Sequence, residues 1–152
     1  MNKFNLTNRN ALITGASGLL GVEHAKSLLE TGATVILTDV NKDALEKVSV
    51  NLSKKYDELK IICKFMDVTN EKNIQNVAED LKNVGLTIDI LVNNAAIDPK
   101  VKEETMLETS RLENFLVEDW DFQIKVGLTG AMLCSKIFGT AMAESNGGVI
   151  LN

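Results

Sequence analysis

The segment Thr14–Gly21, with the sequence TGASGLLG, is rich in glycine and separates two runs of different character. The run before it, Asn10–Thr14, is short, apolar and β-prone, and the run after it, from Leu19 to about Thr31, has helical spacing. A glycine turn between a strand and a helix leaves free backbone N–H groups at the helix N-terminus, where the helix dipole also favours a phosphate or pyrophosphate. One glycine permits the turn, one admits the ligand and one lets helix and strand pack closely. The segment therefore predicts a nucleotide-binding βα unit.

Strand-like and helix-like runs continue to alternate along the 152 residues. This alternation predicts right-handed βαβ units and a parallel sheet covered on both faces. The strand runs are continuously apolar, as in strands buried on both sides, and Gly32 and Gly85 follow helical runs at positions typical of a C-terminal cap. The predicted strands are Asn10–Thr14, Thr34–Thr38, Lys60–Met66, Ile88–Val92 and Val149–Asn152, and the predicted helices are Leu19–Thr31, Lys42–Lys54, Glu71–Asn83 and Glu118–Ser145.

The composition excludes several classes of protein. The chain has a net charge of −5, 45% hydrophobic and 24% charged residues, which is typical of one globular domain, residues 1–152. No basic run favours a nucleic acid or a lipid surface, and no apolar run approaches the roughly 18 residues of a membrane span. The first seven residues lack a signal-peptide core, which predicts a cytoplasmic location.

Three further features have simple interpretations. Cys63 and Cys134 are isolated cysteines, and we interpret them as buried, reduced thiols. His24, the only histidine, has no cysteine or carboxylate cluster beside it and is interpreted as a surface or packing residue. The charged, weakly periodic stretch Asp98–Phe115 contains the only proline, Pro99, and is predicted to be an insertion or lid after the fourth strand.

An acidic residue, Asp39, ends the second predicted strand. In a dinucleotide-binding unit, a carboxylate at this position accepts hydrogen bonds from the adenosine ribose and repels a 2′-phosphate, which favours NAD over NADP. No arginine follows closely, and the nearest cation, Lys42, is expected to face solvent. The alternative interpretation is that Asp39 only begins a turn.

Together, several motifs resemble the short-chain dehydrogenase/reductase family, and the resemblance covers the whole chain. Thr14–Gly21 resembles the cofactor turn of the family, although its glycines follow TGxxGxxG where the classical branch has TGxxxGxG. Asp67-Val68 resembles the adenine contact. Asn93–Ala96 resembles the NNAG segment along the cofactor, with alanine in place of the final glycine.

The C-terminal part carries the resemblance further. Trp120–Lys136 resembles the fourth helix of the classical branch, and Gly147–Asn152 resembles the fifth strand, which leads to the active site. More narrowly, Asn93–Pro99 and Trp120–Lys136 are similar to oxidoreductases of bacterial surface-sugar (nonulosonic acid) biosynthesis.

The resemblance implies an α/β fold: a Rossmann-type, doubly wound parallel sheet in the order 3-2-1-4-5 that stops after the fifth strand. The cofactor crevice would lie where the strand order reverses, between the first and fourth strands. The implied ligands are NAD and, in the full-length enzyme, a small-molecule substrate. The predicted cofactor-binding residues are Gly15, Ala16, Ser17, Gly18, Leu20 and Gly21 at the pyrophosphate, Asp39 and Val40 at the adenosine ribose, Asp67 and Val68 at the adenine, and Asn94, Ala95 and Ala96 at the nicotinamide-side ribose.

One departure from the family pattern is Gly127, which occupies the position of the family's active-site asparagine. Glycine keeps the backbone carbonyl and permits a local bend of the helix, but it removes the side-chain amide. We expect the bend to persist and any water site to rely on the carbonyl. The alternative is an ordinary helix glycine that accepts a close neighbour.

A second departure concerns catalysis. By resemblance, the serine and the Tyr-x-x-x-Lys pair would follow the fifth strand, and the 152 residues do not contain them there. The single match, Tyr56–Lys60, falls between the second and third strands, and we interpret Tyr56 as a residue of a helix surface. The chain is thus expected to be the N-terminal, cofactor-binding part of an NAD(P)-dependent oxidoreductase acting on a carbonyl or alcohol, with a sugar as one candidate, and to be inactive alone. A stand-alone nucleotide-binding or interaction module and a functionless truncated product are the alternatives.

The apolar residues of the last predicted helix, Glu118–Ser145, also allow two interpretations. Met132, Leu133, Ile137 and Phe138 form its apolar face, which most simply packs against the sheet. By resemblance, the same helix could join two copies of the chain in a homo-oligomer.

Overall fold

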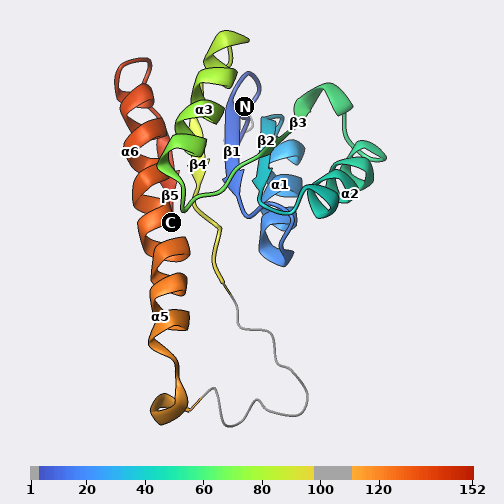
Figure 1. The fold of residues 1–152 in the computed structure, drawn as a ribbon. Helices are drawn as coiled ribbons and strands as arrows, with labels where there is room; N and C mark the ends of the chain where they lie inside the picture. Colours follow the sequence, from blue (N-terminus) through green and yellow to red (C-terminus); the bar gives the residue numbers. More distant parts are fainter. Residues whose placement is uncertain (1–3, 98–110) are drawn as a thin grey trace.

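The computed structural model describes residues 4–97 and 111–152. Its centre is one sheet of five parallel strands in the order β3-β2-β1-β4-β5 (Figure 1). This confirms the predicted α/β class, the parallel sheet and the strand order. The strands are β1 Asn10–Thr14, β2 Thr34–Asp39, β3 Ile61–Phe65, β4 Ile90–Val92 and β5 Val149–Leu151.

Helices cover both faces of the sheet (Figure 1). Helices α1 (Leu19–Glu30) and α2 (Lys42–Ser53) cover one face, and α3 (Glu71–Asn83) and α6 (Gly130–Ala143) cover the other. Each face has its own apolar cluster, so β1, β2 and β4 are buried on both sides as their continuous apolar runs predict. The same prediction is wrong for the two edge strands, because β3 is only partly buried and β5 is exposed. The α1–α2 cluster includes Ile13, Ala25, Leu29, Val35, Leu37, Leu45 and Leu52, and the α3–α6 cluster includes Leu12, Ile36, Ile74, Leu81, Leu91, Cys134 and Phe138.

Local signals account for the helix ends. Asn41 and Asn70 are the N-caps of α2 and α3, and their side chains accept hydrogen bonds from the N–H groups of Ala44 and Asn73. Gly32 and Gly85 have φ angles of 97° and 75°, in the left-handed region that a helix C-terminal cap requires. Both predicted glycine caps are therefore confirmed.

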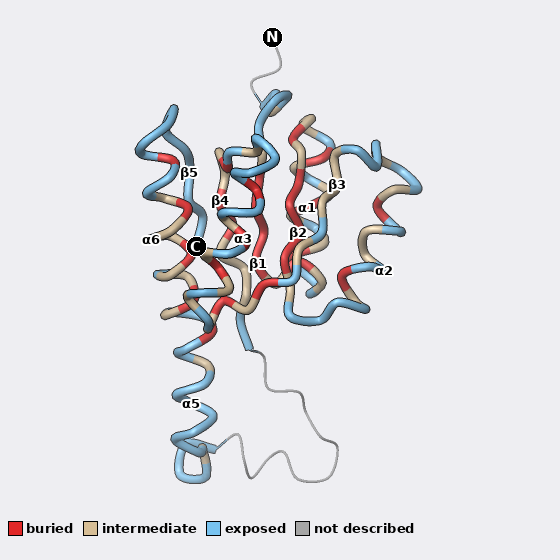
Figure 2. Tube along the Cα trace, turned by 45° about the horizontal axis from the view of Figure 1, so that its top comes forward, coloured by how far each residue is buried: buried red, intermediate tan, exposed pale blue. Residues whose placement is uncertain are grey.

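The long helix predicted over Glu118–Ser145 is divided into three segments. Helix α5 (Val117–Ile124) leads into a π-helical turn, η3 (Lys125–Thr129), and then into α6. Figure 2 shows that α5 extends past the sheet, and none of its residues is buried.

By length and composition, the helical stretch Val117–Ala143 could cross a membrane, contrary to the expectation that no stretch is long enough. A helix that packs on a sheet passes the same test, and α6 packs Cys134, Phe138 and Met142 into the core. The stretch is therefore weak evidence for a membrane span. The cytoplasmic location stays a prediction.

The two cysteines differ in environment. Cys134 is fully buried against the sheet, and burial raises the pKa of its thiol to about 12. Cys63 is exposed on the edge strand β3, so the interpretation of both residues as buried thiols is wrong for Cys63. An edge strand has no neighbour on its outer side, which the apolar run Lys60–Met66 does not reveal. Both cysteines are free, as expected.

Much of the predicted insertion Asp98–Phe115, including Pro99, lies outside the described residues. Within its described end, Leu112–Asn114 forms a short 3-10 helix, η2, ahead of α5.

Candidate cofactor site

A cavity of about 820 Å³ lies at the carboxyl ends of the strands, at the point where the strand order reverses. This volume is within the usual range for a site that binds a small molecule or cofactor. All the predicted cofactor-binding residues except Ala16 and Gly21 line it. The lining also contains residues that the sequence reasoning did not name: Leu19, Asn41, Ala44, Met66, Thr69, Ile97, Phe122 and Val126.

The glycine turn presents a helix N-terminus to this cavity. Gly15 has a φ of +61°, and the N–H of Gly18 donates to the Gly15 carbonyl at 3.1 Å, which closes the turn. Gly18 is the N-cap of α1 and has no side chain to satisfy the first N–H groups of the helix. Because these groups have no intrahelical acceptor, they are free to bind an anion such as a pyrophosphate.

Ala16 and Gly21 lie behind this lining. Ala16 is fully buried in the α1–α2 cluster, and its N–H donates to the Thr38 carbonyl at 3.0 Å. A Cβ atom at Gly21 would lie 2.5 Å from the Gly15 carbonyl oxygen and 2.7 Å from the Ala16 Cα. Gly21 is thus the glycine that lets helix and turn pack closely, and it supports the site without lining it.

A hydroxyl group that the sequence analysis did not single out joins the glycine turn to the β4 turn. Thr14 Oγ1 accepts hydrogen bonds from the N–H groups of Asn94 and Ala95, both at 3.0 Å. In return, Asn94 Nδ2 donates to the carbonyls of Thr14 and Gly15, both at 3.0 Å. The two turns therefore hold each other in place, and Asn94 has a structural role alongside any contact with a ligand.

Asp39 is held in place by the glycine turn. Its Oδ2 accepts from the N–H and the hydroxyl of Ser17 at 3.0 and 2.6 Å, and its Oδ1 accepts from the N–H of Asn41 at 2.9 Å. Asp39 does therefore begin a turn, as the alternative interpretation holds, but its half-buried carboxylate also lines the cavity. The contact of Asp39 with a ribose stays a prediction.

Asp67 and Val68 follow β3 and form the wall of the cavity nearest α3. The Asp67 N–H donates to Asn73 Oδ1 at 2.7 Å, and its Oδ1 accepts from the N–H and hydroxyl of Thr69 at 2.8 and 2.7 Å. Val68 is buried, yet it also lines the cavity. These contacts give the turn a defined shape in the absence of a ligand.

Gly127 lies in the middle of the π-helical turn η3, so the helix is locally irregular, as expected for this position. A Cβ atom on Gly127 would meet nothing within 4 Å. The alternative, a glycine that accepts a close neighbour, is therefore wrong among the described residues. Directly after β4, the amide nitrogen of Asn93 donates to Ser135 Oγ at 3.0 Å and to Asn152 Oδ1 at 2.8 Å, which joins the end of β4 to α6 and to the residue after β5.

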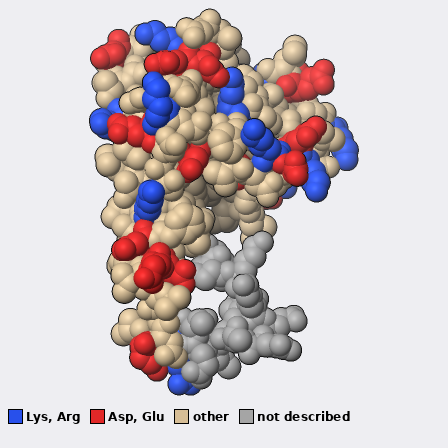
Figure 3. All heavy atoms as spheres, in the orientation of Figure 1, with Lys and Arg blue, Asp and Glu red and all other residues tan. Residues whose placement is uncertain are grey.

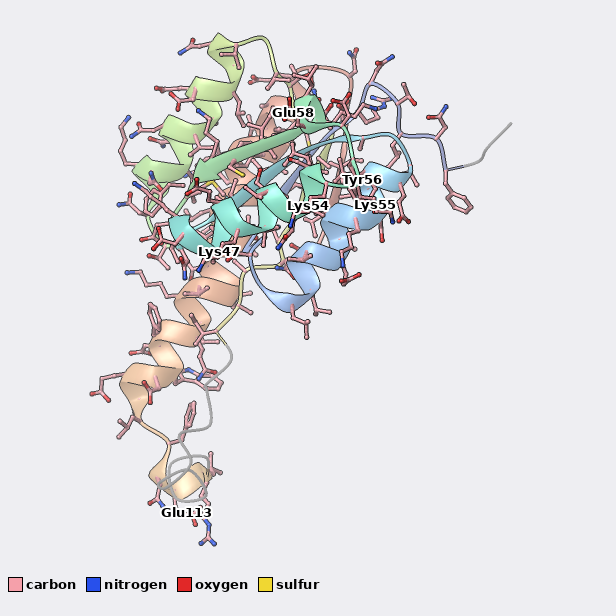
Figure 4. All side chains as sticks on the ribbon, turned by 90° about the vertical axis from the view of Figure 1, so that its right-hand side faces the viewer. Lys47, Lys54, Lys55, Tyr56, Glu58 and Glu113 are labelled. Atoms are coloured by element: carbon pink, nitrogen blue, oxygen red, sulfur yellow. The ribbon has the colours of Figure 1, made fainter. Side chains whose placement is uncertain are left out.

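The Tyr56–Lys60 match is not a catalytic pair. Tyr56 lies after α2, and its hydroxyl donates to Glu30 Oε1 at 2.9 Å, an oxygen that also accepts from Lys55. Lys60 instead donates to the carbonyl of Gly32 at 3.0 Å. Figure 4 shows Lys55 and Tyr56 together beside the end of α1, and neither residue lines the cavity. The interpretation of Tyr56 as a residue of a helix surface is wrong: it lies in the bend after α2 and is partly buried against the α1–α2 cluster.

Nothing in the described part of the chain indicates a metal centre. Residues 4–97 and 111–152 contain no group of three or more histidine, cysteine, aspartate or glutamate side chains that could hold a metal ion. His24 is a partly buried residue of α1. The cavity and the N–H groups at the start of α1 instead suit an extended, anionic ligand at the carboxyl edge of the sheet.

Curated proteins of similar sequence are oxidoreductases. An uncharacterized oxidoreductase of Bacillus subtilis, YxbG, is 35% identical over 147 residues, which are 97% of this chain and 50% of that protein. An NAD-dependent glycerol dehydrogenase of Listeria innocua is 30% identical over 149 residues, 98% of this chain and 53% of that protein. The chain thus spans about half the length of the curated relatives it matches.

Solved structures of similar fold lead to the same group of proteins. A gluconate 5-dehydrogenase from Burkholderia cenocepacia, in complex with NADP and tartrate, has a TM-score of 0.80 and 25% identity, covering 97% of this chain and 53% of that one. The sequence model of one family, described as short chain dehydrogenase, matches residues 9–152, which include every strand of the sheet. The chain therefore belongs to the short chain dehydrogenase family.

Proposed function

We propose that this chain is the NAD-binding part of an oxidoreductase that moves a hydride between nicotinamide and an alcohol or carbonyl carbon. The observation that carries the proposal is that one cavity joins the free N-terminus of α1 to Asp39 and to the Asp67–Val68 turn. These three groups suit a pyrophosphate, a ribose and an adenine in that order. Asn94, Ala95 and Ala96 then follow the cofactor toward its nicotinamide end.

Two features favour NAD over NADP. The carboxylate of Asp39 would face a 2′-phosphate with like charge. Lys42, the nearest following cation, is exposed, and its ammonium lies over the Phe65 ring, 4.9 Å from the centroid, in a hollow along α2 and not in the cavity. The Listeria glycerol dehydrogenase is named NAD-dependent, whereas the Burkholderia structure contains NADP, so the relatives include both preferences.

Replacing Asp39 by asparagine should move this preference. Asp39→Asn keeps the shape of the side chain and removes its charge, so we expect the ratio of NADPH to NADH affinity to rise about tenfold. Fluorescence titration of the two nucleotides measures the ratio. Asp43→Asn removes the same charge from α2 outside the cavity and should leave the ratio unchanged. A change of equal size for both nucleotides would mean that Asp39 acts only on the fold.

We also propose that the 152 residues bind the cofactor without turning over a substrate. Tyr56 is the only tyrosine in the chain, and it lies outside the cavity. Glycerol and gluconate, in the names of relatives, suggest a polyol or sugar acid as the substrate class of the whole enzyme, and the narrower resemblance to surface-sugar oxidoreductases stays a prediction. NADH binding separates this proposal from a functionless product, and turnover of NAD with an alcohol would contradict the proposed inactivity.

A third proposal is that two copies of the chain associate through α5 and η3. Large apolar side chains are exposed along this segment, and in Figure 3 much of its surface is uncharged. Isolated exposed apolar residues are ordinary, but a continuous row of them is typical of an interface. The exposed side chains are Val117 and Trp120 of α5 and Leu128 of η3, with Leu116 just before α5 and Met132 at the start of α6.

Light scattering over a range of protein concentrations tests this association. We expect a mass of about twice the monomer for the unmodified chain, and the monomer mass for Leu128→Glu, because a charge in an apolar interface is costly. Val50→Glu places the same charge on an exposed apolar site of α2 and should leave the mass unchanged. A monomer at every concentration would overturn the proposal.

A further inference from the structure

We propose that Gly130, which does not line the cavity, is a positioning residue for the adenine: its missing side chain lets the Asp67–Val68 turn lie against the start of α6. The inference rests on the proposed NAD site. It concerns how the chain recognises the base of the nucleotide, which neither the glycine turn nor Asp39 contacts.

The Asp67–Val68 turn offers a hydrogen-bond acceptor next to a donor. Asp67 Oδ1 is already used by Thr69. Within residues 4–97 and 111–152, the structure gives no partner to the other carboxylate oxygen of Asp67 or to the N–H of Val68, and both residues line the cavity. Adenine carries an amino donor next to a ring-nitrogen acceptor on its Watson–Crick edge, which is the complementary pair. Hypoxanthine carries a carbonyl and an N–H in these places, so the same turn would reject it.

Hydrogen bonds anchor the turn to α3. Besides the bond from Asp67 N–H to Asn73, the N–H of Asn70 donates to the Asp67 carbonyl at 3.1 Å. Because Val68 directly follows Asp67, a shift of the Val68 backbone also strains these bonds and moves the carboxylate of Asp67.

Gly130, the first residue of α6, lies against this turn. A Cβ atom at Gly130 would lie 2.8 Å from Val68 Cγ2, 3.0 Å from Val68 Cβ and 3.3 Å from the Val68 carbonyl oxygen. Both residues are buried, and a valine side chain has little rotamer freedom with which to move aside. The Lys136–Glu71 ion pair, at 2.9 Å, and the buried side chains of Phe138 and Met142 hold α6 against α3 and the sheet. An added methyl group must therefore displace the turn.

The test compares NADH with its hypoxanthine analogue, nicotinamide hypoxanthine dinucleotide in reduced form, by fluorescence titration of the 152-residue chain. We expect the unmodified chain to prefer NADH about tenfold, from the paired hydrogen bonds to the base. In Gly130→Ala this preference should fall toward one, because both bonds are displaced. Gly139→Ala is the matched control on the same helix, where a Cβ atom would meet only the end of the Ile150 side chain at 3.1 Å, and it should keep the preference.

A double variant keeps the test possible if the Gly130→Ala protein does not fold. Val68→Ala removes the Cγ2 atom that the new methyl group would strike, so Val68→Ala/Gly130→Ala should fold and regain part of the preference for NADH. If Gly130→Ala only lowered the stability of the fold, the affinities for both nucleotides would fall equally and the preference for NADH would remain, which would overturn the inference. Equal affinity of the unmodified chain for both nucleotides would also overturn it. Binding of neither nucleotide to the unmodified chain would instead overturn the proposed NAD site.

Discussion

Replacing Gly21 by alanine is expected to abolish NADH binding and to lower the free energy of unfolding by about 3 kcal/mol. The added Cβ atom would lie 2.5 Å from the Gly15 carbonyl oxygen, 2.7 Å from the Ala16 Cα and 3.0 Å from the Ala16 carbonyl carbon. All three are backbone atoms of the glycine turn, so no side chain can rotate away. The first turn of α1 must separate from the end of β1, and the N–H groups at the helix N-terminus lose their alignment toward the cavity.

Urea denaturation and NADH titration measure the two effects. Gly127→Ala is the matched control, because Gly127 is also a helical glycine but a Cβ atom there would meet nothing within 4 Å. We expect that variant to bind NADH and to be as stable as the unmodified chain or more stable by up to about 1 kcal/mol, since alanine is the better helix former. Unchanged NADH affinity in Gly21→Ala would show that the α1 N-terminus does not hold the pyrophosphate.

The Thr14→Val variant is expected to lose about 2 kcal/mol of stability and to bind NADH at least tenfold more weakly. The substitution keeps the shape of the side chain but removes the oxygen that accepts from the N–H groups of Asn94 and Ala95. Asn94 retains a second acceptor, the Val92 carbonyl at 3.0 Å, whereas the Ala95 N–H is left without one. The turn after β4, which contains Asn94 and Ala95, is therefore less firmly bonded to the glycine turn. The two sides of the cavity lose part of the contact that fixes their relative position.

Thr38 offers a control of the same residue type on the neighbouring strand. It pairs with Thr14 in the register of β1 and β2, and it is equally buried. Its hydroxyl donates to the Ile13 carbonyl at 2.9 Å and accepts no backbone N–H from residues 4–97 or 111–152, so Thr38→Val should cost about 1 kcal/mol and leave NADH binding unchanged. Equal losses of affinity in the two variants would show that the hydroxyl of Thr14 has no special role in the site.

Some residues that line the cavity can be predicted from sequence motifs, and others cannot. The glycine motif predicts Gly15 and Ser17, the end of the second strand predicts Asp39, and all three line the cavity. Thr14 was part of the same motif, but nothing in the chain indicates that its hydroxyl bonds a turn some 80 residues away. Phe122 and Val126 line the cavity from a helix whose pattern predicts only an apolar face. Such residues are found only when distant elements are placed in space.

The sequence by itself determined the alternation of strands and helices, the parallel sheet and the glycine turn between β1 and α1. These follow from hydrophobic period, glycine freedom and capping residues, which act over a few neighbouring positions. The tertiary structure decided which of the helical glycines cannot carry a side chain. Gly21 packs against the glycine turn and Gly130 packs against Val68, whereas a Cβ atom at Gly127 would have no neighbour within 4 Å. All three are helical glycines in the sequence pattern. Their roles differ because a side chain is excluded only where another part of the backbone lies within van der Waals distance, and that proximity exists only in the folded chain.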